Sequence, residues 1–226
     1  MDDIPTWLAS LPPGWIEGCP EAIFFEAREA HRSPGRHYHT WDHVLDCVEK
    51  LRMLPCEAPR TALLALAFHD AVYVAGRKDN EAQSAALAAD VVCEHARLPQ
   101  AEVDEIQRIV LATQSHVPAP DASATLRTVL DIDMSILGAA PERYEAYAEG
   151  VKREYCPAVV SLAQFAAGRV TFLSRLLGAG PIYSTATARA LWEAPARDNI
   201  AREIARLKAS SGPWARWLGW LLRARG

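Results

Sequence analysis

The sequence predicts an all-α fold, and three observations lead to this prediction. Alanine and leucine are abundant, and apolar residues recur at spacings of three and four. The alternation of β-branched and polar residues that is typical of strands is scarce. We therefore expect one helical bundle over residues 1–208, followed by a linker and a short amphipathic, tryptophan-rich helix over residues 209–226.

Five helices are expected in the first half of the chain, after a proline-rich N-terminal segment. Glu21 to His31 gathers apolar side chains on one face, and Thr40 is a favoured capping residue for a helix to about Met53. The segment from Pro59 to about Tyr73 is apolar nearly all round, which predicts a central helix. The next two helices are expected from Asn80, as the capping residue, to Ala96 and from Pro99 to near Ser115.

The second half of the chain is expected to form four more helices before the tail. Gly138 is a favoured residue just past a helix end, so it closes the first of these helices. Pro195 is expected to interrupt the last one, because proline lacks the backbone N–H. The expected ranges are Ala124 to Leu137, Pro141 to near Tyr155, Val159 to Leu177 and Thr185 to Lys208.

Composition limits the partners of this chain. Of its 226 residues, 50% are hydrophobic and 23% are charged, as in ordinary soluble domains, and the formal net charge is -4. A protein that binds a nucleic-acid polymer usually carries a basic excess or a basic stripe, and this chain lacks a global one. We expect no such polymer as a partner, whereas a small phosphorylated substrate fits the composition.

Cysteine usage and the N-terminus indicate a cytoplasmic protein. The five cysteines are odd in number and scattered without a Cys-x-x-Cys pair, which argues against a disulfide framework and a thiolate zinc site. The N-terminus is acidic and lacks the basic and apolar regions of a signal peptide. The longest apolar run, Ala62 to Phe68, is far too short for a transmembrane segment.

Four positions carry the functional prediction: His43, the doublet His69-Asp70, and Asp133. Two imidazoles and two carboxylates suit a divalent metal that activates water. Acidic residues are rarely buried without a partner, so Asp70 in an apolar helix calls for one. Neighbouring helical residues diverge by about 100°, so the doublet reaches one ion only if it lies near a helix end. Asp131 competes with Asp133, and only one of the two should face the ion.

Seven short motifs surround these positions and follow one another in a fixed order. They are Tyr-His-x-x-x-His (Tyr38, His39, His43), Phe-His-Asp-x-x-Tyr (Phe68 to Tyr73), Asn-Glu-x-x-Ser-Ala (Asn80 to Ala85), Thr-x-x-His (Thr113 to His116), Asp-x-Asp-x-x-x-Leu-Gly (Asp131 to Gly138), Arg-Glu-Tyr (Arg153 to Tyr155) and Glu-x-x-Ala-Arg-x-Asn (Glu193 to Asn199). With them the chain resembles the HD superfamily of metal-dependent phosphohydrolases, in particular a bacterial branch of predicted HD phosphohydrolases. The resemblance covers roughly residues 20 to 207.

The resemblance implies a helical HD-type domain that hydrolyses a phosphoester or phosphoanhydride. It also implies the metal ligands His43, His69, Asp70 and Asp133, with Asp133 chosen over Asp131 by its match to the family position. The substrate is expected to be a small phosphorylated metabolite such as a nucleotide. The cofactor is expected to be a divalent cation, either Mn, Fe, Co, Ni, Zn or Mg, among which the sequence does not choose.

Four further residues are candidates for catalytic roles. His39 is expected to donate to phosphate, the alternatives being a second metal or the surface, and His116 either protonates the leaving oxygen, joins a second metal or lies in solvent. Glu81 either holds a water, acts as a base or offsets a helix dipole. Arg153 either holds phosphate oxygens, faces solvent or pairs with Glu154.

Two alternatives to the phosphohydrolase stay open. An HD-type helical cage with more ligands, from His39 or His116, would suit a di-iron oxygenase. A nucleotide-sensing module without turnover is the other, although the His-Asp doublet argues against it. In the tail, an apolar stripe is formed by Trp214, Trp217, Leu218 and Leu221. We expect it to pack on its own domain or on a second subunit in a homodimer rather than on a membrane.

Overall fold

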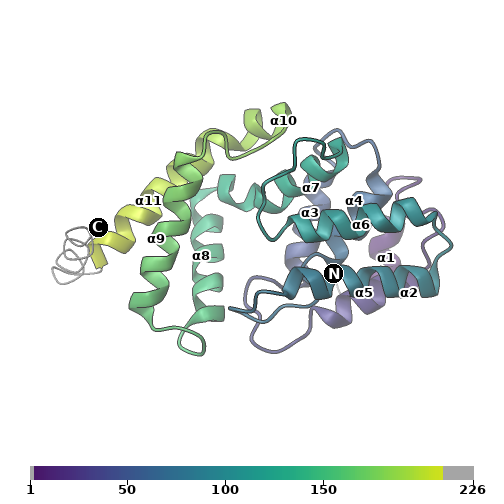
Figure 1. Ribbon diagram of the computed structural model, residues 1–226, viewed down its shortest axis with the longest axis horizontal. Coiled ribbons are helices and arrows are strands. Elements are labelled where there is room, and N and C mark those ends of the chain that lie inside the picture. The colour runs from purple at the N-terminus through teal and green to yellow at the C-terminus, as the bar shows by residue number, and fades with distance from the viewer. Residues whose placement is uncertain (1–2, 211–226) are drawn as a thin grey trace.

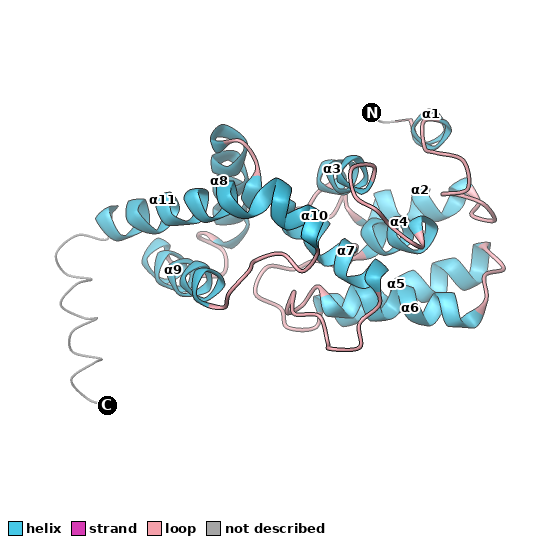
Figure 2. Ribbon diagram, turned by 90° about the horizontal axis from the view of Figure 1, so that it is seen from above, coloured by secondary structure: helices cyan, strands magenta, loops and turns pink. Residues whose placement is uncertain are grey.

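The computed structural model describes residues 3–210, and this range is helical with no strand (Figures 1 and 2). The all-α prediction is therefore confirmed. The α-helices are α1 (Ile4–Ala9), α2 (Glu21–Ala30), α3 (Trp41–Leu51), α4 (Pro59–Phe68), α5 (Asn80–His95), α6 (Gln100–Ala112), α7 (Ala124–Asp133), α8 (Pro141–Tyr155), α9 (Leu162–Gly178), α10 (Ala186–Ala188) and α11 (Ala194–Ser210). A 3-10 turn, Met134–Gly138, follows α7, and a π-helical turn, Arg189–Glu193, precedes α11.

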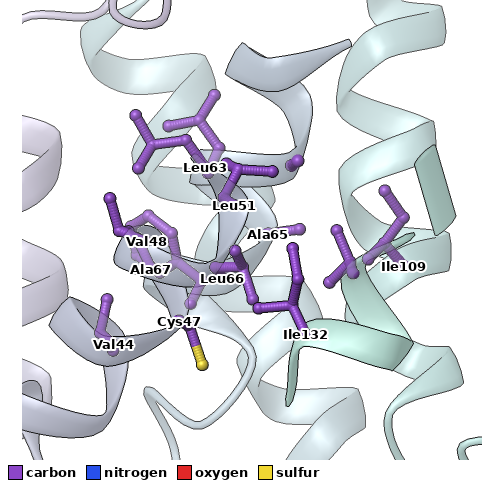
Figure 3. Packing of buried hydrophobic residues seen from close by; sticks show 14 of the residues in the cluster. Val44, Cys47, Val48, Leu51, Leu63, Ala65, Leu66, Ala67, Ile109 and Ile132 are labelled. Carbon is purple, nitrogen blue, oxygen red and sulfur yellow. The ribbon is translucent and has the colours of Figure 1, made fainter. Parts of the chain in front are cut away.

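Helix α4 lies at the centre of the bundle, as its apolar sequence predicts. Residues 62–68 have no exposed surface, and the helix packs against α3, α5, α6 and α7. Figure 3 shows Leu66 of α4 between Cys47 of α3 and Ile132 of α7. Burial of such a helix on all sides stabilises the fold through the area removed from water, and it fixes the positions of the helix ends around it.

The helices fall into two groups in space. Figures 1 and 2 show α1 to α7 together and α8, α9 and α11 beside one another at the other end. Asn199 of α11 joins the groups, because its Nδ2 donates to the carbonyls of Leu137 (2.7 Å) and Ala139 (2.8 Å). Gly138 allows a close approach there, since a Cβ at this position would lie 2.6 Å from the Cβ of Trp192.

Three helix ends differ from the sequence prediction. Helix α4 ends at Phe68, before the doublet, instead of reaching Tyr73. Asn80 does not cap α5, because Asp79 occupies that position; the buried Asn80 side chain instead exchanges two hydrogen bonds with the backbone of Val74. The segment after Asp133 tightens into a 3-10 turn instead of continuing the helix to Leu137.

The interruption expected at Pro195 takes the form of the π-helical turn that precedes it. Proline cannot donate to the carbonyl four residues back and its ring collides with it, so a wider turn accommodates the ring. Helix α9 begins at Leu162 rather than Val159, because Ser161 and Gln164 form a capping box.

The N-terminal segment contains a helix that the sequence reading missed. In α1, Ile4, Trp7 and Leu8 are buried, and the Trp7 ring packs edge-on against Phe24 with 5.6 Å between centroids. Their spacing of three and four residues was the available signal.

The last described helix runs to Ser210, two residues beyond the expected end of the bundle at Lys208. The predicted tryptophan-rich helix lies outside the described residues. Within residues 3–210, no helix combines the length and the apolar character that are needed to cross a bilayer.

Candidate metal centre

Four side chains from three separate parts of the chain, namely α3, the turn after α4 and the end of α7, meet at one point in the fold. His43 Nε2 lies 3.1 Å from His69 Nε2 and 3.1 Å from Asp133 Oδ1. His69 Nε2 lies 3.0 Å from Asp70 Oδ2 and 3.4 Å from Asp133 Oδ1. Asp70 Oδ2 is 3.9 Å from His43 Nε2. We call these four residues the His-Asp cluster.

The end of α4 solves the geometric difficulty of the adjacent His69 and Asp70. His69 is the C-cap residue of α4, and the next turn is closed by a bond from the Ala71 N–H to the Phe68 carbonyl. Because Asp70 already lies past the helix, the two side chains turn toward the same point rather than diverging by about 100°. Asp133 is likewise the last residue of α7.

The ring of His69 is oriented as a metal-binding imidazole usually is. Its Nδ1 lies 2.9 Å from the Leu66 carbonyl, an atom that only accepts hydrogen bonds. Nδ1 therefore carries the proton and donates it, which leaves the lone pair of the neutral ring on Nε2, inside the cluster. His43 and His69 are buried, with side chains 3% and 1% exposed.

The donor set and its spacing fit a divalent cation. Nitrogen and oxygen ligands about 2.1 Å from one ion lie about 3.0 to 3.4 Å from each other, in octahedral and tetrahedral arrangements respectively. The separations that involve His43 or His69 in the His-Asp cluster run from 3.0 to 3.9 Å. Buried His and Asp groups of this kind could hold a metal ion.

Electrostatics keeps the carboxylates of the cluster ionised. Burial alone would raise the pKa of Asp133, but His69, His116 and His43 outweigh it and hold that pKa well below its usual value. Burial also opposes a charged His69, yet Asp70 and Asp133 raise its pKa well above the ordinary value. Cations are thus strongly favoured between these carboxylates, whether protons or a metal ion.

Cys47 lies next to the His-Asp cluster, but its thiol is a poor metal ligand there. Its Sγ lies 3.8 Å from both ring nitrogens of His43, so that His43, Cys47 and Asp133 form a second group within reach of one ion. Burial raises the pKa of the Cys47 thiol well above its usual value, and only the thiolate is a good ligand. Its place in the hydrophobic core agrees with a packing role.

The structure separates the two competing aspartates. Asp131 points away from the cluster and accepts hydrogen bonds from the backbone N–H groups of Ser184 (2.6 Å) and Thr185 (2.7 Å). Asp133, two residues later and so about 200° around the helix, faces the cluster. Asp131 has a structural function, since it ties α7 to the segment that leads into α10.

His116 adjoins the cluster through Asp133. Its Nε2 lies 2.7 Å from Asp133 Oδ2, the oxygen that does not face His43. The backbone of His116 has a φ of 53°, in the left-handed region that residues with a side chain rarely adopt. A strained residue beside a polar cluster is typical of functional sites. The ring is 26% exposed, so it also faces solvent.

His39 lies next to the cluster on the segment before α3. Its ring stacks on Tyr73 with 4.2 Å between centroids and lies 6.1 Å from the ring of His43. Its Nδ1 is 2.7 Å from Oε2 of Glu154, a buried carboxylate of α8. Burial disfavours a charged ring, but Asp70 and Glu154 raise the pKa of His39 above its ordinary value.

Arg36 and Glu154 support the site and were missed as site residues from the sequence. The Arg36 guanidinium donates to the carbonyls of His39 (2.7 Å), Asp70 (2.7 Å) and Ala71 (2.8 Å), so it joins the His39 segment to the loop after α4. The available signal for Glu154 was spacing, since it shares the buried face of α8 with Ala148 and Val151.

Two sequence candidates are not brought to the cluster. Glu81 accepts a hydrogen bond from Gln114 (3.3 Å), and within residues 3–210 no ion pair or hydrogen bond links it to the four residues. Arg153 is exposed, because its neighbour Glu154 takes the inward position on α8. Among the described residues, the alternative in which Arg153 pairs with Glu154 is not found; Glu154 pairs with His39 instead.

Comparisons with known proteins add no assignment. No family model, no curated protein and no solved structure matches this chain. The likeness to the HD superfamily therefore stays a prediction from the motifs, and the functional argument depends on the geometry of the chain's own residues.

Proposed function

We propose that this protein is a metal-dependent phosphohydrolase of the HD type, with His43, His69, Asp70 and Asp133 as ligands. The observation that carries the proposal is the convergence of their nitrogen and oxygen atoms at separations of 3.0 to 3.9 Å. A fold that brings two imidazoles and two carboxylates together in its interior incurs a desolvation cost. Metal binding offsets that cost.

A divalent cation held there would lower the pKa of a bound water toward neutrality and polarise a phosphoryl oxygen. Imidazole and carboxylate donors together suit Mn, Fe, Co, Ni or Zn better than Mg, which prefers oxygen ligands. The surrounding residues exclude bulk water from one side of the site, since His43 and His69 are almost fully buried.

The substrate approaches from the side where the cluster is accessible. The side chains of Asp70, Asp133, His39 and His116 are 17%, 13%, 20% and 26% exposed, in contrast to the two buried imidazoles. A small phosphorylated metabolite such as a nucleotide fits this opening and the motifs. His116, hydrogen-bonded to Asp133, is suited to protonate the leaving oxygen.

The cell compartment and the role of the tail are proposed from the cysteine usage and the tail sequence. All five cysteines are free thiols, which suits a reducing compartment, and we propose the cytoplasm. The proposed contact of the tail with its own domain or with a second subunit depends on residues that the structure does not describe.

The test combines metal analysis of the purified protein with a phosphate-release screen over nucleotides, cyclic nucleotides and sugar phosphates. His69→Ala and Asp70→Ala should lose bound metal and at least about 100-fold in activity, because each removes a ligand. His95→Ala is the matched control: it removes a histidine whose ring pairs with Glu26 on α2, outside the cluster. Hydrolysis that survives both cluster changes would exclude the proposal. Oxygen-dependent turnover with two bound irons would favour the oxygenase instead.

A further inference from the structure

Glu154 of α8 is a buried carboxylate with an unusually complete set of donors. Its Oε1 accepts from the backbone N–H groups of His37 (2.7 Å), Tyr38 (2.7 Å) and His39 (3.0 Å). Its Oε2 accepts from the Tyr73 hydroxyl (3.0 Å) and from Nδ1 of His39 (2.7 Å). The side chain has no exposed surface. Oε1 therefore holds the backbone of residues 37–39, the segment before α3, and Oε2 holds the His39 ring.

The segment of residues 37–39 reaches Glu154 because α8 carries a residue without a side chain, Gly150, at the point of contact. A Cβ at Gly150, one turn before Glu154, would lie 3.1 Å from the Cβ of Tyr38 and 3.2 Å from the carbonyl oxygen of His37. Glycine at this position lets the two backbones approach closely. The contact is thus built into both elements.

The hydrogen bond to Glu154 determines which ring nitrogen of His39 carries the proton. Burial raises the pKa of Glu154, but His39 and the N–H groups of Tyr38 and His37 outweigh it and lower the pKa to about 2. An ionised carboxylate only accepts, so Nδ1 of His39 must be the donor. In the neutral ring the lone pair then lies on Nε2, which has no hydrogen-bond partner within residues 3–210.

We propose that Glu154 is a positioning residue that holds His39 in its Nδ1–H tautomer, so that Nε2 acts as the proton acceptor in the hydrolysis. This inference rests on the proposed function and revises the expectation from the sequence that His39 donates to phosphate. A carboxylate that orients an imidazole in this way appears in the catalytic triad of serine proteases, where it also stabilises the imidazolium that forms.

The reaction step balances without a further co-reactant. As the water oxygen forms its bond to phosphorus, one water proton passes to Nε2 of His39, and the bond between phosphorus and the leaving oxygen breaks. The leaving oxygen takes a proton from His116 or from solvent. His39 later returns its proton to solvent, and Glu154 stays ionised throughout.

Glu154→Gln isolates the orienting function from the structural one. The amide oxygen of glutamine can take the place of Oε1 and keep the three backbone N–H groups bound. The amide nitrogen then faces His39 as a donor, so Nδ1 must accept and the proton moves to Nε2. The substitution therefore reverses the tautomer with little change in shape. Glu149→Gln on the same helix is the matched control, because Glu149 is exposed and pairs with Lys152.

The first measurement is the ¹⁵N spectrum of the His39 ring at a pH above its raised pKa, where the ring is neutral, in the purified protein and after addition of Zn²⁺. We expect a protonated Nδ1 in the wild type and in Glu149→Gln, and a protonated Nε2 in Glu154→Gln. A wild-type His39 with the proton on Nε2 would overturn the proposal. Because this measurement needs no substrate, it tests the role of Glu154 even if the screen shows no hydrolysis and the proposed function fails.

The second measurement is kinetic. Glu154→Gln should lower kcat by about 100-fold or more with KM and bound metal unchanged, since a wrong tautomer removes the proton acceptor. In a His39→Ala background the same substitution should have no further effect on kcat, because Glu154 acts through His39. An equal loss of activity in both backgrounds would show a structural function only and would overturn the proposal.

Discussion

Arg36 offers the sharpest test of how the site is assembled, because one guanidinium holds two loops that carry site residues. We consider Arg36→Met, which keeps an unbranched chain and removes every donor. Three hydrogen bonds of 2.7 to 2.8 Å, to the carbonyls of His39, Asp70 and Ala71, are lost, together with a longer one of 3.4 Å to the Ala30 carbonyl. Burial is the largest cause of the lowered pKa of Arg36, which shows that desolvating the guanidinium offsets part of their benefit.

The expected loss of stability follows from these contacts. An intramolecular hydrogen bond contributes about 0.5 to 1.5 kcal/mol net of desolvation, and we take about 1 kcal/mol for each of these three bonds. Arg36→Met should therefore lower the free energy of unfolding by about 3 kcal/mol. In urea, a slope of about 2 to 3 kcal/mol/M converts this loss into a midpoint lower by about 1 M, with the slope itself unchanged.

The assay is urea unfolding followed by circular dichroism, with Arg32→Met as the control. Arg32 is exposed and pairs with Glu29 on the surface, so its loss should cost less than about 0.5 kcal/mol. Metal affinity should also fall by about 10- to 100-fold in Arg36→Met, since a supporting residue of the ligand loop is gone. If the two variants unfold at the same urea concentration, the guanidinium does not hold the loops and the reasoning is refuted.

Three further predictions concern the fold around the site. Gly138→Ala should lower the free energy of unfolding by about 2 kcal/mol in thermal or urea unfolding, because its Cβ would meet the backbone of Trp192 at 2.8 to 2.9 Å. Gly168→Ala, whose Cβ would enter open space on α9, should raise the free energy of unfolding by about 0.5 to 1 kcal/mol. Equal effects of the two would contradict the packing. The pKa of Glu154 is lowered to about 2, so its contribution to stability is complete above the unfolded value near pH 4.5 and is lost as the pH falls toward 2. Urea midpoints of wild type and Glu154→Gln should thus differ at pH 6 and converge near pH 2, and a constant difference would contradict this. Ser123→Ala should cost about 1 kcal/mol, because the Ser123 hydroxyl accepts from the Leu126 N–H; an unchanged midpoint would show that this cap is not needed.

The sequence predicts most helices of this fold because their beginnings are local. Pro59 and Pro141 occupy first turns, and Thr40 occupies the N-cap position of α3, although its side chain makes no capping bond. The end of α4 is not local. The loop that follows it is held by Arg36, far away in the sequence, which donates to the carbonyls of Asp70 and Ala71 just past the helix end.

The candidate site likewise combines residues that the sequence predicts with residues whose positions depend on long-range packing. The spacing of His43, His69-Asp70 and Asp133 indicates a metal cluster, and the structure brings both carboxylates next to the two imidazoles. Helical phase decides the remaining positions: Glu154 faces inward and Arg153 outward, one residue apart on α8. The motif Arg-Glu-Tyr alone does not reveal this choice, because it depends on which face of α8 packs against the rest of the protein.

The central claim is that the His-Asp cluster binds a divalent cation. The most direct measurement is titration calorimetry with Mn²⁺ and Zn²⁺ on the wild type and on Asp133→Asn and Asp131→Asn, two residues apart on one helix. We predict about one or two bound ions in the wild type and the same affinity in Asp131→Asn. In Asp133→Asn, which removes a ligand, the affinity should fall by more than about 100-fold, the upper limit for removal of a supporting residue. Equal binding by the two variants, or no binding by the folded wild type, would contradict the claim.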